Sequence, residues 1–469
     1  MHSLTAITKS NDLRGAVPEQ WGPAEAVALG VAIAAAFDQA PAILVGHDMR
    51  LSGPAMAKAL IEGITGAGQD VIDLGQVSTD TIYYASGARG LPGAMLTASH
   101  NPAGDNGLKL MRAGAKPMGR EAGLGEVVRQ AEANPNPTPA AQPGAVTQLD
   151  VLPDFARYLR GLVNLATSRP LTVVVDAGNG MGGVVAEAVL GTSAGLPALP
   201  VNLIKLYFEP DGTFPNHPAN PLDPANLRDL QRAVTEHQAD LGLAFDGDAD
   251  RCFVVDETGR VVNPSVIGIV IALHQIGLEQ AAGRQPVIVH NAITSQALPE
   301  LAQAAGATTL RTPVGHALIK PVMAQHDAVF GAEHSGHYYF RDFFYADTGI
   351  LSALHVLAAL GSSDHTLSAL AEVYWPYHAS GEINFRVADP AAVVERVRQA
   401  YAPDAARGVV SIDTLDGLTI GHWDQAPRWW ANVRPSNTEP LLRLNVEAAD
   451  EDVMVKVRTG LSHLIDSKR

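Results

Sequence analysis

This chain has little of what a disulfide-stabilised protein or a nucleic-acid-binding protein requires. It has one cysteine, Cys252, in 469 residues, which excludes an internal disulfide and is typical of a reducing compartment. Its formal net charge of −16 argues against nucleic acid or an anionic membrane as the main partner, because both would be repelled. We therefore expect no nucleic-acid and no membrane partner. An acidic protein that binds anionic small molecules must gather its positive charge locally.

Long apolar runs are also missing. Residues 1–15 lack the apolar core of a secretory signal. The most apolar early stretch, AVALGVAIAAAF at 26–37, is too short to span a bilayer and predicts a buried helix. We expect a soluble, cytoplasmic protein.

What is present is an ordinary globular composition with an internal repeat. Hydrophobic residues make up 46% and charged residues 17%, and the length indicates about two to four domains. Three units share the order strand, helix, strand, helix, strand. In the first unit the strands are expected within 41–53, 70–75 and 93–100. In the second they are expected within 171–183, 201–209 and 240–250, and in the third within 286–296, 308–315 and 327–337.

These alternating elements predict an α/β fold in four domains around one cleft. Three similar domains with mixed sheets are expected, followed by a smaller C-terminal α+β domain, because the pattern changes near residue 372. A proline-rich stretch at 133–146 marks the end of the first domain. The predicted boundaries are 1–148, 149–255, 256–371 and 372–469.

The third strand of each unit runs into an unusually polar loop. These loops are TASHNP at 97–102, DGDADR at 246–251 and EHSGH at 333–337. In open α/β sheets, ligands bind beyond the carboxyl ends of the strands. We therefore expect the three loops to face one cleft.

The second loop, DGDADR, predicts a metal site. Asp246, Asp248 and Asp250 alternate after an apolar strand, and three close carboxylates repel one another unless a cation neutralises them. An EF-hand is excluded because Arg251 replaces its turn glycine and a strand follows. A solvated acidic turn is the alternative. Ligand hardness and availability favour Mg²⁺, and Arg251 is expected to contact a phosphate of the ligand.

Two further loops predict recognition of a phosphorylated sugar. RPSNTEP at 434–440 gathers guanidinium, hydroxyl and amide donors typical of a phosphate site, although an ordinary polar turn has a similar composition. Its candidate ligands are Arg434, Ser436, Asn437 and Thr438, with Arg443 shortly after. In EHSGH, Glu333 and Ser335 suit sugar hydroxyls and His337 suits proton transfer. His316 is expected near the cleft.

Ser99 in TASHNP is not the nucleophile of a typical serine hydrolase. It lies in no G-x-S-x-G motif, and neither an orienting acid nor a base can be assigned to it. The chain also has no Walker-type phosphate loop. A metal loop, a phosphate site and a loop that reads hydroxyls are the parts needed to hold a phosphoryl group on Ser99 and transfer it. GNGMGG at 178–183 matches a dinucleotide motif, but a tight strand-to-helix turn is favoured over a dehydrogenase.

The four loops, in this order, resemble those of the α-D-phosphohexomutases. TASHNP is similar to the phosphoserine loop of that family, DGDADR to its magnesium loop, EHSGH to its sugar loop and RPSNTEP to its phosphate loop. NDLRG at 11–15 and NGLKL at 106–110 also look like family segments. The sugar and phosphate loops are most similar to the bacterial phosphomannomutase/phosphoglucomutase branch. One departure is His290-Asn291, near which bifunctional members often carry a lysine or arginine.

The resemblance implies an isomerase that interconverts hexose 1-phosphates and 6-phosphates through a bisphosphorylated hexose. It implies that Ser99 carries the phosphoryl group and joins the three aspartates in binding Mg²⁺, and that a hexose 1,6-bisphosphate activates the enzyme. Residues implied in catalysis are Arg14, His100, Lys109 and His337. A monomer or weak homodimer acting on mannose or glucose phosphates is expected. Phosphoglucosamine mutase, a metal-dependent sugar phosphatase and a non-catalytic sugar-phosphate-binding protein remain alternatives.

Overall fold

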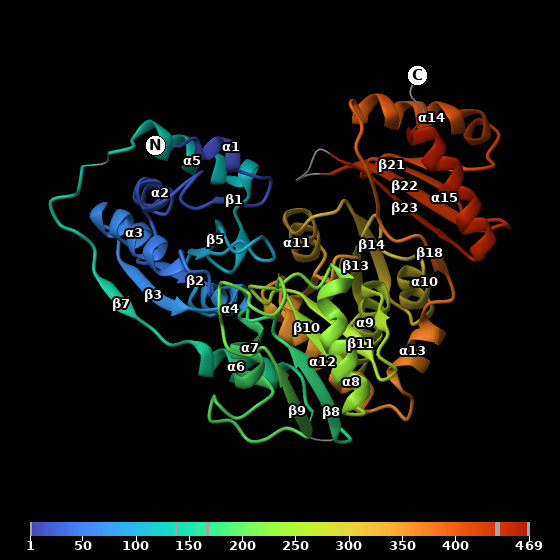
Figure 1. Ribbon diagram of the computed structural model, residues 1–469, viewed down its shortest axis with the longest axis horizontal. Coiled ribbons are helices and arrows are strands. Elements are labelled where there is room, and N and C mark those ends of the chain that lie inside the picture. The colour runs from blue at the N-terminus through green and yellow to red at the C-terminus, as the bar shows by residue number, and fades with distance from the viewer. Residues whose placement is uncertain (1, 137, 166–167, 437–440, 467–469) are drawn as a thin grey trace.

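Three consecutive domains of the computed structural model repeat one sheet arrangement (Figure 1). The structure describes residues 2–136, 138–165, 168–436 and 441–466. In each repeat the first strand lies between the second and the third, and all three are parallel. An antiparallel strand then returns beside the third. Both the predicted repeat and the α/β fold class are confirmed.

The first domain holds a seven-stranded sheet in the order β1-β5-β4-β2-β3-β7, with β6 beside β5. Its strands are β1 Leu13–Ala16, β2 Ile43–His47, β3 Val71–Gln76, β4 Gly93–Leu96, β5 Asp105–Arg112, β6 Lys116–Pro117 and β7 Val146–Gln148. Its helices are α1 Leu4–Ile7, α2 Pro23–Ala36, α3 Gly53–Gly66, α4 Thr79–Arg89 and α5 Leu124–Ala133. The apolar run at 26–37 is the buried helix α2, as predicted.

The second domain has a five-stranded sheet in the order β12-β11-β10-β8-β9. Its elements are β8 Leu171–Asp176, β9 Val201–Leu206, β10 Leu241–Phe245, β11 Cys252–Asp256 and β12 Val261–Val262, with helices α6 Leu152–Leu162, α7 Gly182–Val189 and α8 Arg228–Glu236. GNGMGG forms the tight turn from β8 into α7, where Gly178 and Asn179 have φ of +52° and +57°. The preferred interpretation of this motif as a turn agrees with the structure.

The third domain has a five-stranded sheet in the order β14-β13-β15-β16-β17. Its elements are β13 Val287–Asn291, β14 Thr308–Thr312, β15 Phe330–Ala332, β16 Tyr338–Phe340 and β17 Ala346–Asp347, with helices α9 Pro264–Ala281, α10 Ala297–Ala304, α11 His316–Gln325 and α12 Gly349–Gly361. Helix α13, Leu367–Tyr374, then leads towards the last domain. Among the described residues, short 3₁₀ turns lie at Arg120–Ala122 in the first domain, Pro224–Leu227 in the second and Arg341–Phe343 in the third.

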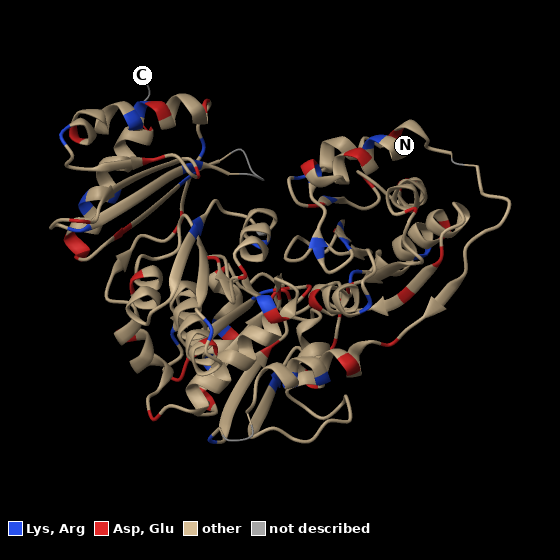
Figure 2. Cartoon of the chain, turned by 180° about the vertical axis from the view of Figure 1, so that it is seen from behind, with Lys and Arg blue, Asp and Glu red and all other residues tan. Residues whose placement is uncertain are grey.

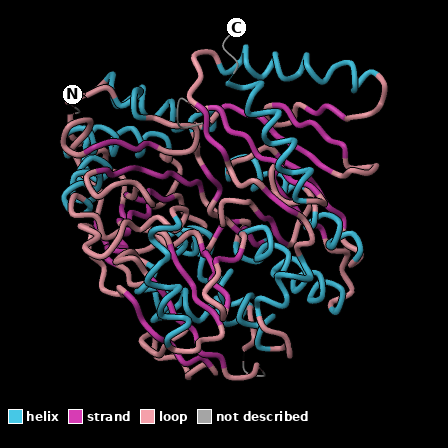
Figure 3. The backbone as a smooth tube through the Cα atoms, turned by 45° about the vertical axis from the view of Figure 1, so that its right-hand side comes forward, coloured by secondary structure: helices cyan, strands magenta, loops and turns pink. Residues whose placement is uncertain are grey.

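The C-terminal domain differs from the other three because its sheet is antiparallel. The order is β18-β23-β22-β21-β20, with β19 also beside β23, and the domain's two helices pack on this sheet (Figures 1 and 3). Its elements are β18 His378–Ala379, β19 Ile383–Phe385, β20 Ser411–Asp413, β21 Leu418–His422, β22 Trp429–Pro435, β23 Leu442–Ala448, α14 Pro390–Ala406 and α15 Glu451–Asp466. The smaller α+β domain is confirmed.

One hydrophobic core runs through the first three domains. It extends from Leu44 of the first sheet through Phe155 to Leu367, whereas the C-terminal domain has a separate core that includes Val397 and Leu461. Burial of apolar surface stabilises by roughly 25 cal/mol per Å², so a shared core holds the first three domains in fixed relative positions. The C-terminal domain lies outside that shared core.

Candidate active site

A cleft of about 1510 Å³ is lined by residues of all four domains. Lys and Arg are spread over the four domains of this acidic protein (Figure 2). Several of them nevertheless gather in the cleft wall, as expected for a protein that binds anions. These are Lys9, Arg14, Lys109, Arg251, Arg434 and Arg443. The three loops predicted to face one cleft all contribute to this wall, with Ser99, Asp250 and Ser335 among the lining residues.

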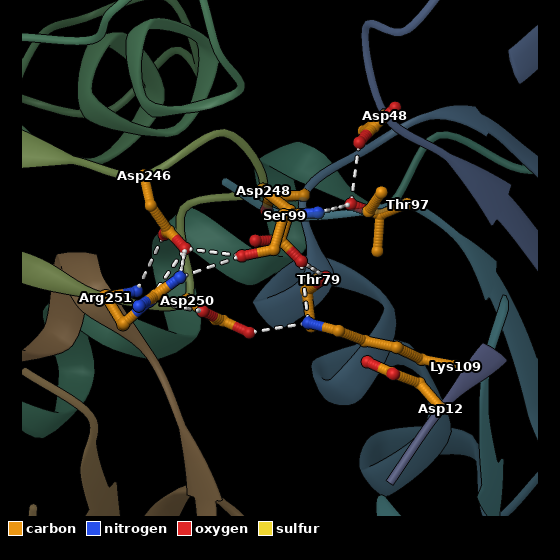
Figure 4. Close-up of polar contacts among 12 residues, drawn as sticks. Asp12, Asp48, Thr79, Thr97, Ser99, Lys109, Asp246, Asp248, Asp250 and Arg251 are labelled. Atoms are coloured by element: carbon orange, nitrogen blue, oxygen red, sulfur yellow. Dashed lines mark hydrogen bonds and ion pairs between the residues drawn. The ribbon is translucent and has the colours of Figure 1, made fainter. Parts of the chain in front are cut away.

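Ser99 lies against the metal loop of the next domain (Figure 4). Its Oγ donates a hydrogen bond of 2.7 Å to Asp246 Oδ2 and accepts one of 3.0 Å from Arg251 Nη2. The side chain is 2% exposed, and the backbone adopts a left-handed φ of +50°. Such strain in a residue other than glycine is typical of functional loops. The expected contact of Arg251 with a phosphate of the ligand stays a prediction.

Arg50 holds the Ser99 loop in place, and sequence reasoning missed it. This buried guanidinium donates to four backbone carbonyls of the loop, with distances between 2.7 and 2.9 Å, those of Ser99, Asn101, Pro102 and Asp105. The Thr97 hydroxyl, two residues before Ser99, donates a hydrogen bond of 2.6 Å to the Asp48 carboxylate, which also forms an ion pair with Arg50. The sequence did contain a signal for this contact, because Asp48 and Arg50 directly follow β2. The carboxyl ends of parallel strands meet at the same edge of a sheet, so these residues could be expected near the Ser99 loop, which follows β4.

The aspartates of DGDADR converge as predicted. One carboxylate oxygen from each of Asp246, Asp248 and Asp250 lies within 4.8 Å of the others, and all three side chains are buried. Lys109 Nζ contacts Asp248 Oδ2 and Asp250 Oδ2, both at 2.7 Å (Figure 4). The pKa of Asp250 is raised by burial and by Asp248.

This donor set fits a hard divalent cation. Asp248 Oδ1 and Asp250 Oδ1 are buried and make no hydrogen bond, although a buried carboxylate oxygen without a partner is costly. A cation accounts for both atoms, since hard ions bind carboxylate oxygens. The acidic triad is therefore able to bind a metal ion.

Glycine is required where the metal loop meets the Ser99 loop. A Cβ on Gly247 would lie 2.5 Å from the Ser99 carbonyl oxygen, closer than such atoms approach. Helix α4 contacts the same loop, because Thr79 donates its N–H to the Asp248 carbonyl at 3.0 Å and its hydroxyl to Asp248 Oδ2 at 2.6 Å. These contacts set the position of the serine relative to the aspartates.

His100 and Arg14 surround the serine loop. His100 Nδ1 lies 3.3 Å from Ser99 Oγ and accepts from Arg251, and burial together with that guanidinium lowers the pKa of His100 to about 2. Its ring is therefore neutral. Arg14 donates to the carbonyl of Ala98 at 3.2 Å and to Asn101 Oδ1 at 3.0 Å. Burial opposes the charge of Arg14, but nearby Asp12 raises its pKa.

The sugar loop separates its three predicted residues. Ser335 and His337 line the cleft. Glu333 is not among the residues that line the cleft in the described part of the chain; it is 3% exposed and accepts from Tyr339 at 2.6 Å and from the Gly315 N–H at 2.9 Å. Its contact with a sugar hydroxyl stays a prediction. His337 is held by Asp347, which sequence reasoning missed.

Arg434, at the start of the phosphate loop, and Arg443, on β23 just after it, lie on the cleft wall. Arg434 Nη2 lies 3.2 Å and Arg443 Nε 3.3 Å from the two oxygens of Glu382, another residue that the sequence did not reveal. Ser436 donates its N–H to the Leu441 carbonyl at 2.8 Å. Asn437 and Thr438 lie outside the described residues, and so does the side chain of His316, the first residue of α11.

The cleft between the four domains joins Ser99, the acidic triad and two arginines, and each of these domains matches a domain of one known family. Phosphoglucomutase/phosphomannomutase alpha/beta/alpha domains I, II and III match residues 5–136, 154–259 and 263–377, and the C-terminal domain of that family matches residues 382–461. The chain belongs to the phosphoglucomutase/phosphomannomutase family, which consists of enzymes. The resemblance inferred from the loops is confirmed.

The chain is similar to named relatives along its whole length. A phosphomannomutase of Escherichia coli is 38% identical, with 98% of both chains covered. Phosphohexose mutases of Xanthomonas campestris are 37% identical, covering 96% of this chain and 97% of theirs. A crystal structure of a phosphoglucomutase/phosphomannomutase family protein from Burkholderia thailandensis superposes with a TM-score of 0.84 at 26% identity, covering 99% and 98% of the two chains. Among the described residues, no helix is both long and apolar enough to cross a membrane.

Proposed function

We propose that this protein is a phosphomannomutase/phosphoglucomutase that interconverts hexose 1-phosphate and hexose 6-phosphate through a phosphoserine at Ser99. The proposal rests on the position of Ser99 Oγ beside the acidic triad. This oxygen donates a hydrogen bond of 2.7 Å to Asp246 and accepts one of 3.0 Å from Arg251. The names of full-length relatives at 37–38% identity support it. Mannose phosphates are proposed as substrates because the Escherichia coli relative is named for them.

The first half-reaction moves the phosphoryl group from Ser99 to the free hydroxyl of the substrate. The bond between Ser99 Oγ and phosphorus breaks, a bond from phosphorus to the sugar oxygen forms, the sugar hydroxyl proton leaves to a base, and the freed Ser99 oxygen takes up a proton to become a hydroxyl. Phosphoryl transfer depends mainly on positioning and on charge stabilisation. Arg251 already donates to Ser99 Oγ and suits the oxygens of the phosphoserine, while Lys109 lies beside the triad.

The three aspartates and the phosphoserine would hold Mg²⁺, which would neutralise charge on the transferring group. We assign His337 to proton transfer with the sugar hydroxyl, since its ring lines the cleft and is anchored on one side. Arg14 lies close enough to the Ser99 loop to stabilise charge there. His100, neutral and bonded to Arg251, supports that guanidinium.

The second half-reaction returns the other phosphate of the bisphosphorylated hexose to Ser99. The intermediate must turn over in the cleft, so each phosphate occupies the serine end and the arginine end in succession. Arg434 and Arg443 suit the phosphate that is not reacting, with Ser436, Asn437 and Thr438 as further donors. Hexose 1,6-bisphosphate is proposed as the activator because it would phosphorylate Ser99 directly.

Replacing Ser99 with alanine tests the carrier role. We expect Ser99→Ala to abolish isomerisation and to remove the phosphorylated species from the intact-protein mass spectrum. The matched control is Ser52→Ala, whose hydroxyl bonds to Asn106 in the same domain and lies outside the cleft wall of the described residues. The control should keep both the phosphorylation and the activity. Isomerisation by Ser99→Ala at the wild-type rate would overturn the proposal.

A further inference from the structure

The third domain holds a buried ion pair, Lys320 with Asp347, that is assigned no step of the proposed reaction. Lys320 in α11 and Asp347 at the end of β17 form an ion pair, with Nζ 2.7 Å from Oδ1. Each side chain is 3% exposed. Burying two charges is unfavourable unless their mutual attraction offsets the loss of hydration, so a pair this buried is expected to position another group.

The second oxygen of Asp347 holds the histidine of the sugar loop. Oδ2 lies 3.0 Å from His337 Nδ1, and the imidazole stacks on Tyr339 with centroids 6.3 Å apart and planes 19° apart. Asp250 Oδ1 also lies near this nitrogen, 3.9 Å from Nδ1. Both acids therefore face the same ring nitrogen. Within the part of the chain that the structure describes, no protein hydrogen bond is recorded for Nε2, and His337 lines the cleft.

Lys320 itself is not placed to meet a substrate. It is absent from the cleft wall of the described residues, and its ammonium lies 4.3 Å from the ring centroid of Tyr83 and 5.6 Å from that of Tyr339. Aromatic faces stabilise a desolvated cation. Tyr83 belongs to α4 of the first domain, so the ion pair is fixed from two domains. Its charge acts on Asp347 rather than on a ligand.

We propose that Lys320 and Asp347 are positioning residues that orient His337 and fix its tautomer. Lys320 holds Oδ1 of Asp347, Oδ2 accepts the proton of His337 Nδ1, and Nε2 is left facing the cleft to exchange a proton with the sugar hydroxyl. A carboxylate behind a histidine sets its tautomer in this way. The inference deepens the proposed function and rests on it for the identity of the proton's partner.

An asparagine at position 347 gives a directional test. The amide oxygen of Asp347→Asn should turn to Lys320, because a cation requires an acceptor, and the amide NH₂ then faces His337. Nδ1 must now accept, which places the proton on Nε2. Nitrogen-15 NMR of histidine-labelled protein, at a pH where the ring is neutral, reads the tautomer directly. A His337→Gln spectrum identifies the signal.

We expect the Nδ1–H tautomer in the wild type, the Nε2–H tautomer in Asp347→Asn, and a mixture in Lys320→Met. The control is Arg341→Met, which removes an ion-pair partner of the buried Glu279 in the same domain and should leave the tautomer unchanged. An unchanged tautomer in both Asp347→Asn and Lys320→Met would overturn the inference.

Kinetics supply the second readout. A displaced catalytic group typically costs on the order of 100-fold in rate, so kcat should fall by about that factor in Asp347→Asn while KM changes little. A rise in KM with kcat unchanged would contradict a role in proton transfer. If the wild type fails to isomerise hexose phosphates, the proposed function is wrong, yet the tautomer of the metal-free, substrate-free protein still decides whether the pair positions His337.

Discussion

The serine end and the arginine end of the cleft are built in different ways. At the serine end, Gly247 and Thr79 connect the first two domains around Ser99, and Arg50 holds the Ser99 loop from within the first domain. A single hydrophobic core continues through these domains. At the arginine end, Arg434 and Arg443 belong to a domain that has its own core. Its polar contacts with the third domain include Glu447 with the Gln296 N–H, Asp416 with the Val314 N–H and Arg311 with Thr419.

This difference suits the serine end to phosphoryl transfer and the arginine end to binding of the non-reacting phosphate. In the proposed reaction, phosphoryl transfer would require the serine and the acidic triad to be placed within a few tenths of an ångström, and a shared core with close backbone contacts supplies that precision. The non-reacting phosphate would have to be released while the proposed intermediate turns over, which a separately packed domain permits. Changes at the serine end should therefore act on kcat, and changes at the arginine end should act on KM.

The largest expected effect comes from crowding the serine end. In Gly247→Ala, the new Cβ would lie 2.5 Å from the Ser99 carbonyl oxygen, so the two loops must separate. We expect kcat to fall by about 100-fold, as for a displacement of roughly 1 Å, while KM changes little. Steady-state kinetics measure both.

Gly161→Ala is the matched control, because nothing lies within 4 Å of a Cβ in that helix. It should keep wild-type kinetics. A normal kcat in Gly247→Ala would mean that the close contact between the loops is not needed for transfer.

A change at the arginine end should act mainly on binding. Arg434→Met removes a guanidinium from the cleft wall. A hydrogen bond to a charged group contributes about 1.5–3 kcal/mol, so KM should rise by roughly 10- to 100-fold. Saturating substrate should restore most of kcat, and phosphorylation of Ser99 should persist by mass spectrometry. A loss of kcat at saturation without a rise in KM would remove the distinction between the two ends.

The smallest effect concerns stability and pH. Asp80 in α4 accepts from Thr348 of the third domain at 2.7 Å, and burial raises its pKa to about 7. Because this pKa is higher in the folded protein than in the unfolded chain, stability is lost as the pH rises through it. Between about pH 5 and pH 8 the loss is on the order of 2–3 kcal/mol.

In Asp80→Asn the side chain does not ionise, so the variant loses no stability from ionisation of a buried carboxyl at high pH. Its melting temperature relative to that of the wild type should therefore rise as the pH increases, as measured by calorimetry. A constant difference across this range would show that Asp80 does not bind a proton on folding.

The sequence predicted local features well and contacts between distant segments poorly. Asp246, Asp248 and Asp250 lie within five consecutive positions, and hydrophobic periodicity revealed the three strand repeats, so both were predictable. Arg50, Lys320, Asp347 and Glu382 act through partners tens to hundreds of residues away, as with Arg50 and the Ser99 carbonyl. Such pairings depend on tertiary packing, which one sequence does not specify. Glu333 is a second kind of case. Its polarity predicted a place on the cleft wall, but its carboxylate is buried and accepts hydrogen bonds from Tyr339 and the Gly315 N–H, which depend on tertiary packing.

Phosphorus-31 NMR tests the central claim most directly. The purified protein is mixed with mannose 1-phosphate, Mg²⁺ and a trace of glucose 1,6-bisphosphate, and the resonances are followed with time. We expect growth of the mannose 6-phosphate resonance, and repeating the measurement with glucose and glucosamine phosphates would rank the sugars. Growth of inorganic phosphate in its place would contradict the proposed function, because Ser99 would then belong to a phosphatase and not to a mutase.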